Sequence, residues 1–264
     1  MTTAARNPNL DVVRAGAIAM VVLAHSAVMS PVRHPLALTL AWIGQFGVDL
    51  FFVLSGWLIG GLFWAERAKF GDVEWRRFFL RRALRTIPPY FVVLPFAWYV
   101  VHRFAADHPP FDFGFLAFLQ NYYAKIPYYS ISWSLCVEEH FYLLFPALVL
   151  FALARRLSPH VLFAVLLVVS PLCRTVFENT NDIGIFDRSV LSTHLRLEGL
   201  VVGFWAAYIA ATDANLWARC SRLFPRLLLP ALVAVMAAVQ LTNRPLQPPA
   251  VLAPTLLITE EVPA

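Results

Sequence analysis

Two ionisable residues lie inside the first apolar segment of the chain and are the first candidates for chemistry. Arg14 and His25 stand in the sequence LDVVRAGAIAMVVLAHSAVM. On a helix, eleven steps of about 100° return to within roughly 20° of the starting direction, so both side chains share one face. At about 1.5 Å per residue they lie roughly 16 Å apart in depth. Ionisable groups inside an apolar span are costly and usually functional, and a buried neutral imidazole is a suitable general base.

A cluster of arginines precedes the third apolar segment. The cluster consists of Arg76, Arg77, Arg81, Arg82 and Arg85. Their spacing places several of them on one helical face. Arginine forks bind phosphate well, so the cluster is a candidate site for a phosphorylated ligand. The alternative is topological, because such clusters also fix orientation and contact anionic lipid head groups. Pro88 and Pro89 follow and are expected to mark the start of the next span.

Carboxylates lie near the start of two other apolar segments. Asp49, in GQFGVDLFFVLSG, either makes a structural hydrogen bond near the interface or pairs with a buried cation or orients a catalytic histidine. Glu138 and Glu139, in SISWSLCVEEHFYLLFP, are adjacent and therefore point about 100° apart. Glu138 shares a face with Ser134 one turn earlier, so we expect Glu138 to face a cavity and to handle protons there. The alternative is a belt of aromatic residues and solvated acids at the outer interface.

One further pair of charges, Arg196 and Glu198, opens the sixth apolar segment in THLRLEG. The two residues are too close in sequence to face each other on a helix, so each is expected to pair across helices, unless they only cap the segment locally. The histidines are scattered and show no HxxxH or HExxH spacing, so no metal site is expected. There is also no phosphate loop, no GxSxG elbow and no dinucleotide fingerprint.

The elements that must position these residues are membrane spans. The chain is 59% hydrophobic and 14% charged, with a mean hydropathy of +0.66, whereas a soluble domain is about one quarter charged. Apolar runs approach the roughly 20 residues that cross a bilayer. The sequence therefore predicts an all-α, polytopic bundle with seven spans, at about 12–30, 44–66, 87–103, 133–153, 159–173, 194–211 and 227–241. The stretch 111–123 is expected to be interfacial or re-entrant.

The orientation follows from the basic residues. A cytoplasmic N-terminus places the 67–85 loop, Arg155, Arg156 and the arginines around 219–226 on the inner side, as the positive-inside rule favours. We expect an integral protein of the bacterial inner membrane, surrounded by membrane lipids, and no nucleic-acid partner.

Together these segments resemble the acyltransferase-3 family of membrane proteins, which includes O-antigen and exopolysaccharide O-acetylases. The resemblance depends on five motifs in family order over roughly the first 205 residues, which are Arg14 and His25, Gly47–Gly56, Arg81–Tyr90, Trp133–Pro146 and Thr193–Gly199. Two positions depart from the family pattern: His140 stands where glutamine is expected, and Glu198 where aspartate is expected. The family core has about ten spans, so we expect one membrane domain, over 1–264, that is incomplete at its C-terminus.

The resemblance implies transfer of an acyl group, expected to be acetyl, from cytoplasmic acyl-CoA to a hydroxyl of a carbohydrate or lipid-linked acceptor. It implies no permanently bound cofactor. The roles that follow are catalysis by His25, Glu138 and Asp49, donor binding by Arg14, Arg81, Arg82 and Arg85, and acceptor binding by Ser134, Arg196 and Glu198. The alternatives are a transporter or flippase of lipid-linked sugars, which also needs buried charges, and a truncated, non-catalytic membrane protein.

Overall fold

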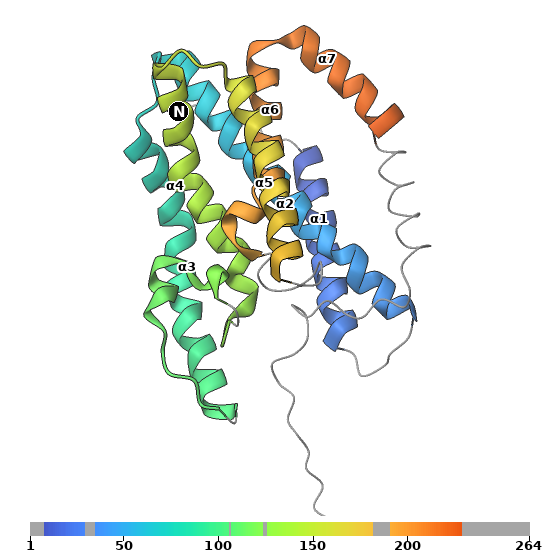
Figure 1. Cartoon of the computed structure of the whole chain (residues 1–264), viewed down its shortest axis with the longest axis vertical. Helices are drawn as coiled ribbons and strands as arrows, with labels where there is room; N and C mark the ends of the chain where they lie inside the picture. The colour runs from blue at the N-terminus through green and yellow to red at the C-terminus, as the bar shows by residue number, and fades with distance from the viewer. Residues whose placement is uncertain (1–7, 30–34, 106, 124–125, 182–190, 229–264) are drawn as a thin grey trace, which may run out of the picture. The chain divides into compact units, whose positions relative to one another are not determined.

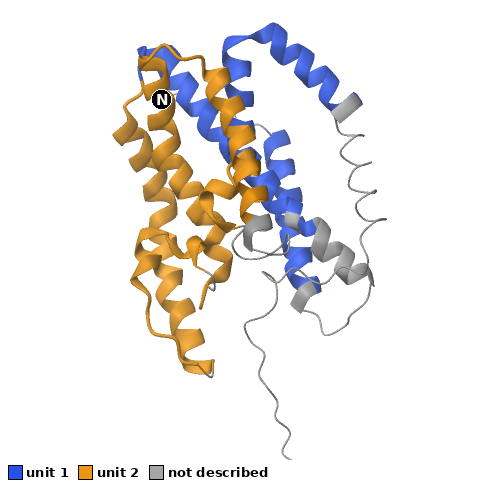
Figure 2. Ribbon diagram, viewed as in Figure 1, with its two compact units in different colours: residues 1–72, 199–248 blue, residues 73–198, 249–264 orange. Residues whose placement is uncertain are grey.

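A computed structural model describes residues 8–29, 35–105, 107–123, 126–181 and 191–228 of the chain. Within these ranges the chain forms helices joined by short turns and contains no strand, which confirms the predicted all-α class. By its internal contacts the chain divides into two compact units (Figure 2). Unit 1 comprises Met1–Asp72 and Gly199–Pro248, and unit 2 comprises Val73–Glu198 and Pro249–Ala264. The prediction of a single domain stays a prediction.

Five of the described helices are long and apolar enough to cross a membrane. They are α1 (Pro8–Met29), α2 (Pro35–Phe70), α3 (Trp75–Phe104), α4 (Trp133–Ala154) and α5 (Pro159–Asn181) (Figure 1). Two shorter helices follow, the apolar α6 (Glu198–Thr212) and the polar α7 (Ala214–Leu223). Large apolar side chains such as Val92 and Phe96 lie exposed on the long helices, as contact with lipid requires. Of the predicted seventh span, residues 229–241 lie outside the described residues.

The start of α3 differs from the prediction. The chain leaves α2 at Phe70, turns at Gly71 and is helical again from Trp75, so the arginine cluster has the predicted helical spacing and belongs to α3 itself, before the predicted span 87–103. Pro88 and Pro89 lie inside α3 rather than at its beginning. Membrane helices tolerate such prolines because neighbouring groups satisfy the freed carbonyls. The earlier start is held by Trp75, whose indole Nε1 donates to the Leu143 carbonyl of α4 at 3.0 Å.

Helix α5 also runs further than predicted. The sequence placed its end at residue 173. In the structure, helix α5 continues to Asn181, because the Arg174 side chain finds partners in a later turn of the chain and Thr175 donates to the Pro171 carbonyl of its own helix. By contrast, the predicted fourth span, 133–153, matches α4 closely.

Glycines set the packing of α2 within unit 1. On one side, Gly44 and Gly47 face α1, where a Cβ at Gly47 would lie 2.8 Å from the Ala17 carbonyl oxygen. On the other side, a Cβ at Gly56 would collide with the Leu200 backbone, and one at Gly60 would lie 3.0 Å from the Phe204 Cα. Gly60 lies four residues after Gly56 on α2, and Phe204 lies four residues after Leu200 on α6. The two helices therefore run parallel. Small residues at such spacing allow close backbone approach.

Helix α6 contributes its own glycines to this contact. A Cβ at Gly199 would lie 2.9 Å from the Phe52 Cβ, and one at Gly203 would overlap the Val53 carbonyl. The aromatic rings of Phe63, Trp64 and Phe204 fill the space beyond the glycines. The glycines of the GVDLFFVLSG segment are therefore packing residues, and they place Asp49 on the turn of α2 beside the start of α6.

In unit 2, α3 and α4 lie side by side and run antiparallel (Figure 1). The segment between them contains the 3-10 turns η1 (Phe113–Ala117), η2 (Gln120–Tyr122) and η3 (Ser130–Ser132). Asp112 caps η1 by accepting hydrogen bonds from the Gly114 amide at 2.7 Å and the Tyr123 hydroxyl at 3.0 Å. The predicted interfacial stretch 111–123 is thus short helical turns held by side-chain hydrogen bonds.

The glycine contacts make a matched pair of substitutions informative. Gly203→Ala should push α6 away from Val53 and lower the free energy of unfolding by about 1–3 kcal/mol, as overpacking does. Gly61→Ala meets nothing within 4 Å, so its higher helix propensity should leave the protein unchanged or more stable. Thermal unfolding of the purified variants in one detergent measures both. Equal stability of the two variants would contradict the α2–α6 contact.

Candidate functional site

His25 and Arg14 lie on α1, in unit 1, and both are half-buried. The His25 Nδ1 lies 2.8 Å from the Val21 carbonyl oxygen. A carbonyl can only accept, so Nδ1 carries the proton in this contact, which leaves Nε2 as the nitrogen that can accept a proton. Ala17 and Ala24 are fully buried, and they lie on a different face of α1, about 80–100° away from His25. The imidazole is therefore held in the tautomer that a general base needs.

Arg14 has a partner on its own helix. Its guanidinium lies 3.6 Å from the Asp11 carboxylate, one turn earlier, with the two side chains 40% and 33% exposed. Exposed pairs of this spacing add little stability. Donor binding by Arg14 stays a prediction, and the structure adds that Asp11 would compete for the guanidinium. Asp49, also in unit 1, is half-buried on α2.

The arginine cluster lies along the first three turns of α3, in unit 2. Arg76, Arg77, Arg81 and Arg85 are exposed, whereas Arg82 is half-buried. The Arg82 guanidinium lies over the Tyr142 ring of α4, 5.8 Å from its centroid, a geometry typical of a cation–π contact. Four exposed guanidinium groups on one helical segment are accessible to an anion. The α3 helix gives them the helical spacing that the sequence predicted.

The two adjacent glutamates of α4 differ in environment. Glu138 is half-buried and accepts a hydrogen bond from the Tyr142 hydroxyl, 2.6 Å from its Oε2. Tyr142 thereby links Glu138 to Arg82. Glu139 is 5% exposed, and its carboxylate interacts with Thr86 and Arg82 of α3, while its Oε1 has no hydrogen-bond partner among the described residues. The sequence analysis predicted that Glu138 faces the interior, but Glu139 is the more buried of the two. The catalytic roles of both residues stay predictions.

Ser134 does not join the glutamates. Its hydroxyl lies 3.5 Å from the Ile131 carbonyl, at the first turn of the same helix. This long contact is a local bond to the carbonyl three residues earlier and leaves the hydroxyl near the start of α4. Its predicted role in acceptor binding is untested.

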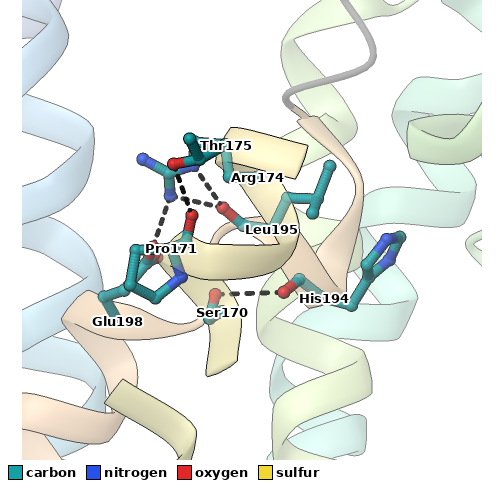
Figure 3. Close-up of polar contacts among 7 residues, drawn as sticks. All are labelled: Ser170, Pro171, Arg174, Thr175, His194, Leu195 and Glu198. Atoms are coloured by element: carbon teal, nitrogen blue, oxygen red, sulfur yellow. Dashed lines mark hydrogen bonds and ion pairs between the residues drawn. The ribbon is translucent and has the colours of Figure 1, made fainter. Parts of the chain in front are cut away.

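The turn before α6 is held by Arg174, a residue that the sequence did not single out. Its guanidinium donates to the Leu195 carbonyl and to the Glu198 carboxylate, 2.6 Å away, and both side chains of this ion pair are 26% exposed (Figure 3). Ser170, one helical turn earlier on α5, donates to the His194 carbonyl at 3.0 Å. Glu198 thus pairs across helices as its spacing predicted. Arg196 lies over the Trp133 ring of α4, 5.3 Å from its centroid.

A second set of buried polar side chains meets the same turn. Asn121, 1% exposed, donates to the Leu191 carbonyl at 3.2 Å and to the Thr193 hydroxyl at 2.9 Å. The His140 Nδ1 lies 2.7 Å from that hydroxyl. Gln120 is fully buried and donates to the hydroxyls of Tyr90 and Ser132, at 3.1 and 3.0 Å. The polar run LQNYY was the signal for this network, but its partners lie too far along the chain to be inferred.

The predicted residues therefore form separate groups within their units. Unit 1 carries Arg14, His25 and Asp49. In unit 2, Arg82, Tyr142 and Glu138 form one chain of contacts, and Arg174 and Glu198 form another. Within the part of the chain that the structure describes, no three His, Cys, Asp or Glu side chains are grouped to hold a metal ion.

Comparison with known proteins adds the family to this geometry. A family model described as an acyltransferase domain, acyltransferase 3, matches residues 7–258. The chain belongs to the acyltransferase-3 family. Its five long apolar helices agree with an integral membrane protein of that family.

The curated relatives that the chain matches are named as O-acetyltransferases. The O-acetyltransferase OatA of Staphylococcus aureus strain NCTC 8325 is 28% identical over 220 residues, covering 76% of this chain and 34% of the relative. A putative O-acetyltransferase of S. aureus strain COL is 25% identical over 223 residues, with the same coverage. This acyltransferase-3 chain thus matches about a third of the length of these relatives. No solved structure shows a significant match to it.

The Arg174 contacts predict that removing the guanidinium lowers the stability of the protein. Arg174→Gln leaves the Glu198 carboxylate and the Leu195 carbonyl without their cation and should cost about 1–3 kcal/mol of unfolding free energy. Glu198→Gln should cost less, because Arg174 keeps its bond to Leu195. Arg103→Gln, an exposed position on α3, is the control. Chemical unfolding in detergent measures all variants, and an Arg174→Gln protein as stable as the control would contradict the anchor.

Proposed function

We propose that the chain carries out membrane O-acyl transfer, moving an acetyl group from acetyl-CoA to a hydroxyl of a carbohydrate or lipid-linked acceptor. Membership of the acyltransferase-3 family supports acyl transfer, and the names of the S. aureus relatives support acetyl as the group and oxygen as the acceptor atom. The observation that carries the proposal is His25, an imidazole set in an apolar helix with Nδ1 bonded to a carbonyl. Such a ring can take a proton at Nε2 from an attacking hydroxyl.

The donor would bind through the arginines of α3. Arg81 and Arg85 are exposed and Arg82 is half-buried against Tyr142, so three guanidinium groups along one stretch of helix suit the phosphates of coenzyme A. Arg14 is proposed to assist by leaving its ion pair with Asp11 and binding a phosphate of the donor. The reaction needs no resident cofactor or metal, because the thioester is itself activated.

The orientation belongs to the same proposal. The basic residues around the α2–α3 turn and on α7 favour a cytoplasmic side for these ends of the helices, a cytoplasmic N-terminus and the bacterial inner membrane as location. The donor arginines would then face the compartment that supplies acetyl-CoA. Asp49, Ser134, Arg196 and Glu198 are proposed to orient catalytic groups or the acceptor, as the family resemblance implies.

His25→Ala tests the catalytic base. Transfer of acetyl from radiolabelled acetyl-CoA to a hydroxyl acceptor should fall at least about 100-fold, since general bases typically contribute that much, while membrane insertion is unchanged. Ser26→Ala is the matched control, because Ser26 is exposed on the next position of α1. Wild-type transfer by purified His25→Ala protein would rule out this role.

The two glutamates give a second test with separable readouts. Glu138→Gln should lose most of the transfer activity, because it removes the charge that Tyr142 connects to Arg82. Tyr142→Phe keeps the ring over Arg82 and removes only the hydroxyl, so it should give a smaller loss. Glu139→Gln should keep most activity and change the melting temperature instead, because Glu139 is buried against α3. The reverse pattern would assign the catalytic role to Glu139.

A further inference from the structure

Two exposed rings lie side by side in unit 2, and the proposed catalytic roles use neither. The Tyr122 ring of η2 stacks on the His194 ring, with centroids 5.9 Å apart and planes at 11°. Tyr122 is 46% exposed, and His194 is also exposed. The half-buried His140 ring of α4 lies tilted beside Tyr122 at 6.1 Å. Tyrosine combines an apolar ring with a polar tip and is therefore enriched where proteins bind partners.

Buried hydrogen bonds hold both rings in place. Asn121, the residue before Tyr122, donates to Thr193, the residue before His194. Ser170 donates to the backbone carbonyl of His194 itself, and Arg174 donates to that of Leu195. The His194 ring points away from this anchor (Figure 3). The chain thus fixes the two rings through the buried side chains of Asn121 and Ser170 and the half-buried side chain of Arg174, which is how a preformed binding site is built.

The polar tips of the two rings are available to a ligand. Among the residues that the structure describes, neither the Tyr122 hydroxyl nor a ring nitrogen of His194 has a hydrogen-bond partner. Partial burial lowers the pKa of His194, so at neutral pH its ring is uncharged and offers one donor and one acceptor. The hydroxyl of Tyr122 can also donate and accept. Rigid apolar faces with neutral donors and acceptors at their edges match a ring that carries many hydroxyl groups.

We infer that Tyr122 and His194 form the subsite that binds a pyranose ring of the acceptor. The sugar ring would lie against the rings of the stack, and its hydroxyls would exchange hydrogen bonds with the phenol and the imidazole. This inference depends on the proposed function, because it takes the acceptor to be a carbohydrate. It adds a place for the sugar that is separate from the arginines proposed to bind the donor, and it makes a neutral acceptor more suitable than a phosphorylated one at this site.

Direct binding tests the subsite without the reaction. Tetramers of glucose, mannose and N-acetylglucosamine are titrated into the purified, detergent-solubilised chain by calorimetry, with sorbitol as an open-chain polyol. At least one tetramer should bind saturably and sorbitol should not. Tyr122→Ala and His194→Ala should each weaken that binding about tenfold or more, as loss of a central contact does, and Tyr122→Phe should weaken it less. Tyr99→Ala, an exposed tyrosine of α3, should have no effect.

The pH dependence adds a signature that a purely structural role would not show. As pH falls through the lowered pKa of His194, its ring gains a proton and loses its acceptor, so sugar binding should weaken on the acid side of neutrality. In His194→Gln this dependence should disappear while part of the binding remains.

The outcomes separate this subsite from the proposed reaction. Failure of all three tetramers to bind, or unchanged binding by both alanine variants, would overturn the subsite. Binding of [¹⁴C]acetyl-CoA by the same proteins reports on the donor side alone. If acetyl transfer proceeds with the same acceptor KM in Tyr122→Ala as in the wild type, the subsite is wrong and the reaction stands. If sugar binds at the stack but no acetyl is transferred, the subsite stands and the reaction does not.

Discussion

Backbone groups that are buried outside regular helix need hydrogen-bond partners from the protein, because water does not reach them. The turn before α6 meets this demand with side chains: Asn121 donates to Leu191, Ser170 to His194 and Arg174 to Leu195. These three bonds join η2 and α5 to a segment that is far away in sequence. They fix where the chain enters α6, and with it the positions of His194, Arg196 and Glu198. The arrangement of unit 2 around this turn depends on them.

Arg174 acts in this arrangement as a charge that is satisfied twice. Its guanidinium meets a carbonyl and a carboxylate at once, which suits the fork of donors that arginine presents. A lysine could also donate to both groups, but its three donors sit on one nitrogen and lack the spaced planar fork of the guanidinium. The carboxylate at position 198 therefore takes part in an ion pair rather than standing open to a ligand. Acceptor contacts by Glu198 would require Arg174 to be shared.

The sequence predicted long apolar elements well and their partners poorly. The span 133–153 matches α4 because its ends carry clear signals, a Trp at the start and two arginines after the end. The start predicted for the third span from Pro88 and Pro89 was wrong, because prolines, which often begin helices in soluble proteins, also occur within membrane helices. Arg174 was missed since its partners, Leu195 and Glu198, lie beyond the end of the predicted span. Which of Glu138 and Glu139 is buried depends on where α3 packs against α4. The helical periodicity of α4 alone does not predict the position of its neighbour.

Site residues follow the same rule. The stacked Tyr122 and His194 are more than seventy residues apart, so only the fold brings them together. By contrast, the tautomer of His25 is decided within one turn of α1, where Val21 accepts its proton. Local geometry could thus be derived from spacing, whereas the pairing of distant segments could not.

The glycine contacts between α2 and α6 have a consequence for biosynthesis. The face of α2 that carries Gly56 and Gly60 is made long before Leu200 and Phe204 leave the ribosome. During synthesis that face meets lipid, and α2 can close early only on α1, through Gly44 and Gly47. The α1–α2 hairpin is therefore a natural first assembly, and the second glycine face stays open to lipid or an insertion factor until α6 arrives. Slow or interrupted translation before residue 200 would prolong the lifetime of that unmatched surface.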